Sequence, residues 1–89
     1  MIVVYLLSSN AIHYNPVGLW DTVPPQTPIG IFAKSERARQ YARDELGVPD
    51  DWITQENGEQ HISVLSQHKQ YTICKVVIDS EIKGKAAWV

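Results

Sequence analysis

The stretch IGIFAKSERARQYARDELG, residues 29–47, joins a short apolar run directly to a sequence with helical periodicity. Residues 29–33 are rich in branched and aromatic side chains, which favour a strand. Ser35 is the best N-cap available, and Gly47 and Pro49 are expected to end the helix that follows. A strand joined directly to a helix indicates a fold that mixes both kinds of element.

One side of the predicted helix is apolar. Its apolar or partly apolar residues recur at the i, i+3, i+4, i+8 spacing of a single buried stripe, and they are Ala38, Tyr41, Ala42 and Leu46. We expect this stripe to face a sheet, with the arginines on the opposite, exposed side.

Two further segments have the patterns of buried strands. Residues 2–7 are apolar on both alternating faces, which predicts a strand in the middle of a sheet. Residues 71–79 alternate, and one face carries Thr72, Cys74, Val76 and Ile78. Residues 86–89 could add a short final strand.

The connections between these segments have contrasting compositions. Asn57-Gly58 lies between residues 52–56 and 59–65, which predicts a β-hairpin with a two-residue type I′ turn. Residues 66–70 are polar and should turn. Residues 8–28 begin with turn-forming residues and are rich in proline, which predicts a long irregular loop.

Together these patterns predict an α+β fold, a small and mostly antiparallel sheet with one helix packed across one face. A chain of 89 residues has room for one modest core, so we expect a single domain over residues 1–89.

Composition excludes several functional classes. The formal net charge of -2 argues against general nucleic-acid binding, which requires a basic surface. Cys74 is the single cysteine, so no intrachain disulfide can form, and we expect a buried thiol and a cytoplasmic protein. The apolar run of residues 2–7 is too short for a signal-peptide core or a membrane span.

Several segments resemble a family of small uncharacterised bacterial and phage proteins. The matching positions are residues 4–7, residues 29–32, Glu36, Ala38, residues 77–79 and Trp88. The chain departs from the family in having Ala33-Lys34 where the family prefers serine, and in carrying the Asn57-Gly58 hairpin. The resemblance implies a fold and supplies no site.

The sequence contains no complete catalytic or metal-binding motif. His61-Ile-Ser63 matches one H-x-S element of the two-histidine phosphoesterases, which need two, so a strand histidine is favoured. His13, His61, His68 and Cys74 lack compact ligand spacing. The sequence therefore predicts no catalytic residue, no metal and no cofactor.

Four residues are candidates for contact with a partner or ligand: Trp20, Lys34, Arg39 and Arg43. Arg39 and Arg43 lie one helical turn apart, and nothing at i+3 or i+4 pairs with Arg43. With Lys34 they could form a stripe facing an anion or an acidic partner, although a solvated helix face is the simpler alternative. Trp20 could be a binding hot spot or could pack over the edge of the sheet.

The leading functional prediction is a small non-catalytic binding protein, phage or mobile-element encoded, that inhibits or modulates a larger protein partner. The alternative is a homo-oligomer that captures an anionic small molecule such as a nucleotide at subunit interfaces. An enzyme ranks third, and neither general nucleic-acid binding nor a membrane is expected.

Overall fold

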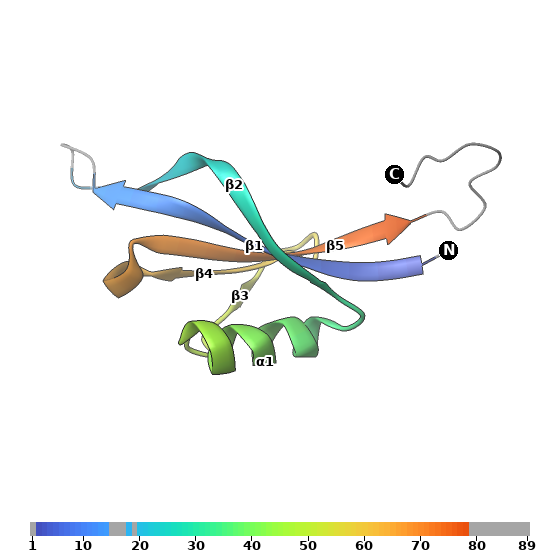
Figure 1. Ribbon diagram of the computed structural model, residues 1–89. Coiled ribbons are helices and arrows are strands. Elements are labelled where there is room, and N and C mark those ends of the chain that lie inside the picture. Colours follow the sequence, from blue (N-terminus) through green and yellow to red (C-terminus); the bar gives the residue numbers. More distant parts are fainter. Residues whose placement is uncertain (1, 15–17, 19, 79–89) are drawn as a thin grey trace.

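The computed structural model describes residues 2–14, 18 and 20–78, which form a five-stranded antiparallel sheet and one α-helix (Figure 1). The elements are β1 (Ile2–Tyr14), β2 (Trp20–Phe32), α1 (Ser35–Leu46), β3 (Ile53–Thr54), β4 (Gln60–Val64), the 3-10 turn η1 (Leu65–Gln67) and β5 (Lys69–Ile78). The strand order is β2-β1-β5-β4-β3, and each neighbouring pair is antiparallel. The predicted α+β class with an antiparallel sheet is confirmed.

Helix α1 ends where the sequence predicts and begins with a different cap. Gly47 adopts the left-handed conformation at φ 67°, and the Val48 N–H donates to the Ala42 carbonyl at 3.0 Å. The N-cap is Lys34, whose side chain makes no capping bond, and Ser35 is the first helical residue. The prediction of Ser35 as N-cap is wrong, because the extended backbone of Lys34 already presents its carbonyl to the first turn.

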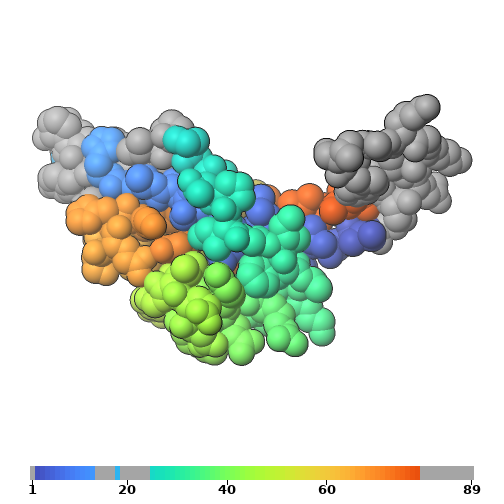
Figure 2. Space-filling model, in the orientation of Figure 1, coloured from blue at the N-terminus to red at the C-terminus, as the bar shows by residue number. Residues whose placement is uncertain are grey.

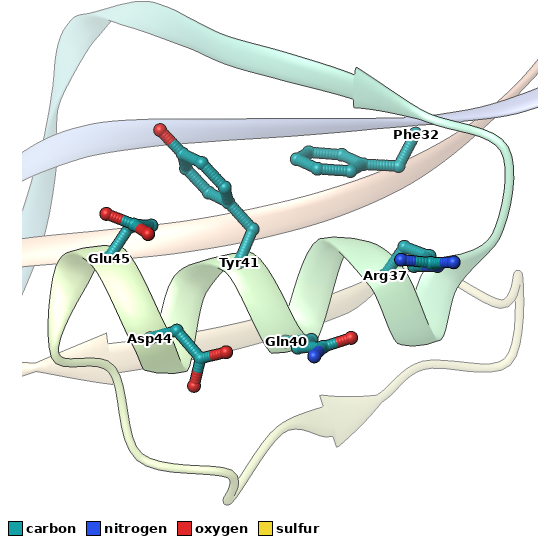
Figure 3. A pocket seen from close by; sticks show the side chains of 6 residues that line it. All are labelled: Phe32, Arg37, Gln40, Tyr41, Asp44 and Glu45. Atoms are coloured by element: carbon teal, nitrogen blue, oxygen red, sulfur yellow. The ribbon is translucent and has the colours of Figure 1, made fainter.

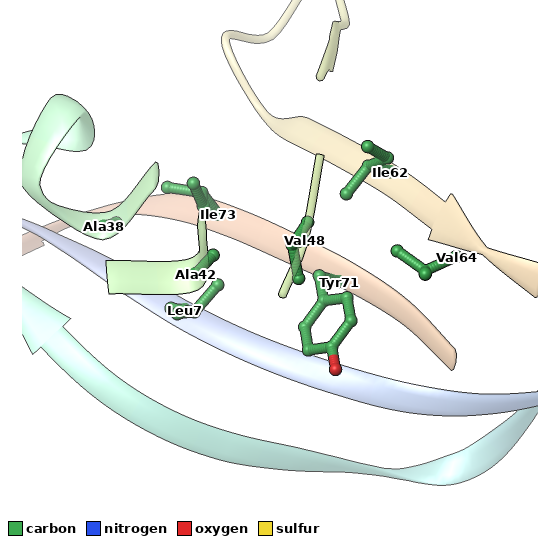
Figure 4. Packing of buried hydrophobic residues seen from close by; sticks show 8 residues of the cluster. All are labelled: Leu7, Ala38, Ala42, Val48, Ile62, Val64, Tyr71 and Ile73. Carbon is green, nitrogen blue, oxygen red and sulfur yellow. The ribbon is translucent and has the colours of Figure 1, made fainter. Parts of the chain in front are cut away.

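The buried core joins α1 to the strands (Figure 4). Its members are Leu7, Ala38, Ala42, Val48, Ile62, Val64, Tyr71 and Ile73. Both alanines of α1 are fully buried, whereas Leu46 is half-buried beside them. Figure 2 shows the green helix as a separate layer on one side of the strands. Tyr41, which the periodicity assigned to the buried stripe, is 39% exposed.

Strand β1 is an interior strand, as predicted, because it pairs with β2 on one side and β5 on the other. Leu7 is fully buried on the face of the sheet next to α1. Leu6 points to the opposite face and is half-buried, and Ile2 is largely exposed. Residues 2–7 of β1 are therefore apolar on both faces, but among them only Leu7 is fully buried.

The prediction of a long loop over residues 8–28 is wrong. The strand pairing of β1 and β2 continues to Tyr14 and Trp20, so most of this segment forms a long hairpin. Its proline-rich half lies in β2, an edge strand, where proline need not donate to a further strand. The register is interrupted between Ser9 and Ala11, opposite the stretch that contains Pro24 and Pro25.

The predicted hairpin after α1 forms with a different turn. The Gly58 N–H donates to the Gln55 carbonyl at 2.9 Å, which centres the turn on Glu56 and Asn57. A type I′ turn centred on Asn57-Gly58 would need positive φ at both residues. Only Gly58 has one, at 85°. The Asn57 side chain instead accepts the Glu59 N–H at 2.9 Å, so the type I′ prediction is wrong.

Strand β5 alternates as predicted. Tyr71 and Ile73 are buried toward α1, and Cys74 lies on the opposite face. Cys74 is only half-buried, so the prediction of a fully buried thiol is wrong. The predicted strand at residues 86–89, with Trp88, lies outside the described residues.

Candidate functional site

Arg39 holds α1 against strand β4. Its side chain is half-buried, and Nη1 donates to Gln60 Oε1 at 2.7 Å and lies 3.5 Å from Ser35 Oγ. The prediction that Arg39 stays exposed is therefore wrong. The residue on β4 that engages it was not recognisable from helical spacing, because the two positions come together only in the tertiary fold.

Arg43 and Lys34 remain at the surface. Arg43 Nε lies 3.3 Å from Asp44 Oδ1, and the two side chains are 57% and 52% exposed. Arg43 thus has a partner at i+1, which the search at i+3 and i+4 missed, although so exposed a pair contributes little. Arg39 is bonded to Gln60 within the fold, and the stripe of Lys34, Arg39 and Arg43 facing an acidic partner stays a prediction.

Trp20 is the first residue of β2, opposite Tyr14, and is not in a loop. The predicted binding role of its side chain falls outside what the structure describes.

The structure contains a groove along α1 (Figure 3), and neither Arg39 nor Arg43 is among its lining residues. It encloses about 260 Å³ between the helix and the end of β2. The lining residues are Phe32, Arg37, Gln40, Tyr41, Asp44 and Glu45. Those on the helix recur at i, i+3, i+4, i+7 and i+8 from Arg37, so they share one face.

Two aromatic rings form the apolar part of this groove. The ring centroids of Phe32 and Tyr41 are 5.5 Å apart with their planes tilted by 48°. This is within the range of favourable aromatic pairs. The Phe32 ring lies back over Gly30, where an added Cβ would meet Cε2 at 3.2 Å. Glycine at this position therefore leaves room for the ring.

The charges of the groove are separated along the helix. Arg37 lies toward the start of α1, and Glu45 lies toward its end (Figure 3). Eight residues of helix separate them by about 12 Å at 1.5 Å per residue. Asp44 adds a second carboxylate near Glu45, so the groove has a basic end and an acidic end.

The groove adjoins an unpaired strand edge. Strand β2 is at the end of the sheet order, so one side of its backbone has no strand partner among the described residues. Pro24, Pro25 and Pro28 remove donors from the middle of this strand, whereas residues 29–32 contain no proline. Ile31, on the face opposite Phe32, is 67% exposed. This short end of β2 is the proline-free part of the edge that lies beside Phe32 and the groove.

The sequence contained part of the signal for this groove. Arg37, Tyr41 and Glu45 follow one another at intervals of four, which is visible without a structure. Tyr41 was assigned to the buried stripe, and Phe32 was assigned only to a strand. Their contact depends on the short connection through residues 33–34, which returns the helix alongside β2.

Other polar side chains in the described part of the chain have structural partners. The Tyr71 hydroxyl donates to Gln67 Oε1, and Gln67 Nε2 donates to the Leu46 carbonyl at 2.8 Å. Burial raises the pKa of Tyr71. These bonds tie the end of α1 to β5. Across residues 2–14, 18 and 20–78, no group of three or more His, Cys, Asp or Glu side chains could hold a metal ion.

Comparison of the chain with protein-family models, with curated proteins and with solved structures gave no match. The resemblance to small bacterial and phage proteins therefore stays a prediction. None of the helices in the described residues is long and apolar enough to cross a membrane.

Proposed function

We propose that this chain is a non-catalytic protein-binding module that holds an extended segment of a larger partner in the groove between α1 and β2. The observation that carries the proposal is the Phe32–Tyr41 aromatic pair beside the unpaired, proline-free end of an edge strand. In this proposal α1 covers one face of the sheet through Ala38 and Ala42, and the groove follows its outer flank.

The proposed binding mode is strand addition. An extended segment that pairs with residues 29–32 satisfies backbone groups that β1 leaves unpaired, and its alternate side chains point toward the helix side. One of these side chains enters the groove against Phe32 and Tyr41. The three prolines of β2 disfavour such pairing along the middle of the strand, and residues 29–32 are the proline-free part next to the groove.

The charges of the groove define the chemistry of the segment. Arg37 favours an acidic side chain, and the carboxylates of Asp44 and Glu45 favour a basic one. A separation of about 12 Å corresponds to about four residues of extended chain at about 3.3 Å each. The proposed ligand is a segment with an apolar or aromatic residue between an acidic and a basic residue about four positions apart.

A small domain that occupies such a segment would block or modulate the larger protein to which the segment belongs. The resemblance to phage proteins supports extending the proposal to a phage or mobile-element inhibitor, and the single cysteine supports a cytoplasmic setting. Nucleotide capture at subunit interfaces is the alternative, and one of its candidate residues, Arg39, is already bonded to Gln60 within the fold.

Selection from a random dodecapeptide phage-display library on the immobilised chain tests the proposal. We expect enrichment of an apolar or aromatic residue between opposite charges. Binding of a synthetic selected peptide, measured by fluorescence polarisation, should weaken at least tenfold in Tyr41→Ala and in Arg37→Glu. Arg37 is exposed, so Arg37→Glu should keep the wild-type melting temperature. Tyr41→Ala loses the contact with Phe32 and should melt roughly 4–8 °C lower while remaining folded.

Lys69→Glu is the matched control, since it makes the same charge change at an exposed position at the start of β5, outside the groove, and should leave peptide binding unchanged. A peptide N-methylated at alternate backbone amides separates strand addition from side-chain contact alone, and should bind more weakly. Failure to enrich any peptide would contradict the proposal. Peptides that bind Tyr41→Ala and Arg37→Glu as tightly as wild type would also contradict it.

A further inference from the structure

The sheet projects beyond the helix as a two-stranded ribbon formed by one end of β1 and one end of β5 (Figure 1). Pairing with β2 begins at Tyr5, and pairing with β4 begins at Ile73. Residues 2–4 and 76–78 therefore pair only with each other among the described residues. We call this segment the apolar ribbon, and its members are Ile2, Val3, Val4, Val76, Val77 and Ile78.

The apolar ribbon presents hydrophobic side chains on both faces. Ile2 is 49% exposed and Val77 is 53% exposed. The register pairs Ile2 with Ile78 and Val77 with Val3, so these two exposed side chains lie on opposite faces. Strands that are apolar on both faces are typical of sheets covered on both sides. An isolated two-stranded ribbon is at best marginally stable in water.

We infer that a second copy of this chain covers the apolar ribbon, so that the two ribbons pack together in a symmetric dimer. A two-fold interface brings the same patch of each copy together, and it must therefore be compatible with itself. All six ribbon residues are uncharged, so no like charges oppose one another. The formal net charge of -2 per chain is small, which keeps the repulsion between whole copies weak.

The strand edges of the apolar ribbon are also suited to pairing with a second copy of the chain. Residues 2–4 contain no proline and no charged residue, the devices that usually block pairing between edges. The outer edge of β2 carries prolines at positions 24, 25 and 28, and its proline-free end, residues 29–32, is the edge proposed for peptide binding. The edge on the apolar ribbon likewise lacks these devices, and two copies can pair antiparallel there across a two-fold axis.

Sedimentation velocity of the full chain from 5 to 500 µM tests the inference. We expect the monomer to convert to dimer as the concentration rises. Val77→Lys and Ile2→Lys should each raise the dissociation constant at least tenfold, because each would bury a charge in the interface. Leu65→Lys is the matched control, since Leu65 is 48% exposed in η1, at the opposite end of β5. It should change the dissociation constant less than twofold.

Hydrogen exchange at the amides of residues 2–4 provides a second measurement. In a dimer their protection should increase with protein concentration. A chain that stays monomeric over the whole range would overturn the inference, and concentration-independent protection would point to residues 79–89 as the covering segment. A dimer that forms equally well in Val77→Lys and Ile2→Lys would overturn it too. The ribbon lies apart from the groove, so Val77→Lys should bind the selected peptide normally.

Discussion

Replacing Arg39 with methionine should destabilise the protein more than the same replacement of Arg43. Both residues lie in α1, and methionine has a similar helix propensity and a similar apolar stem. The pair of variants therefore compares the interactions of the two guanidinium groups. Arg39 reaches from the helix to β4, whereas Arg43 reaches only its neighbour in the helix.

The magnitudes follow from the geometry of the two contacts. A hydrogen bond to a charged group contributes about 1.5–3 kcal/mol. Because Arg39 is half-buried, we expect the lower end of this range, about 1.5 kcal/mol, for its 2.7 Å bond to Gln60 Oε1. The Arg43–Asp44 pair is more than half exposed, so Arg43→Met should cost about 0.5 kcal/mol or less.

Urea denaturation monitored by circular dichroism measures both effects as shifts of the midpoint at constant slope. A double-mutant cycle of Arg39→Met with Gln60→Met should give a coupling of about 1 kcal/mol. A coupling of zero would refute the assignment of Arg39 as a link between helix and sheet. An Arg39→Met variant as stable as Arg43→Met would refute it as well, and would return Arg39 to the set of residues available for a ligand.

Three other predictions concern the stability of the fold. Leu7→Ala should lower the free energy of unfolding by about 2–5 kcal/mol, since Leu7 is fully buried. Leu46→Ala should lower it less, because Leu46 is only half-buried. Urea denaturation midpoints measure both changes. Gly47→Ala should cost about 1 kcal/mol in the same assay, because Gly47 has a φ of 67°. Burial raises the pKa of Tyr71 above its ordinary 10.0, so its stabilising contribution is complete below the unfolded-state pKa and is lost as the pH rises through the higher folded-state pKa. Ultraviolet titration should show a late-ionising tyrosine signal that Tyr71→Phe removes.

Local patterns in the sequence were sufficient to predict α1, the alternation of β5 and the existence of the hairpin near Asn57. Each of these depends on residues close together in the chain. The long β1–β2 hairpin was not predicted, because a proline-rich segment predicts a loop unless it is known to form an edge strand. That position depends on the order of the strands in the whole sheet.

Two of the residues predicted to contact a partner, Arg39 and Arg43, lie on the same helix as the groove, but neither of them lines it. Arginines on a helix are common candidates for binding residues, but in the structure Arg39 donates a hydrogen bond to Gln60 on β4. The groove depends on Phe32 meeting Tyr41, and one of these residues comes from a strand and the other from a helix. Sequence spacing shows which helical residues share a face, but it does not show which strand lies beside that face.

The most direct test of the proposed binding groove is a nuclear magnetic resonance titration of the isotope-labelled chain with the selected peptide. The account predicts that the largest amide shift changes fall on residues 29–32 and on the α1 positions from Arg37 to Glu45. Residues 29–32 should also gain protection from hydrogen exchange, because strand addition supplies partners for their backbone groups. Shift changes centred on Arg39, Arg43 and β4, with residues 29–32 unaffected, would contradict it.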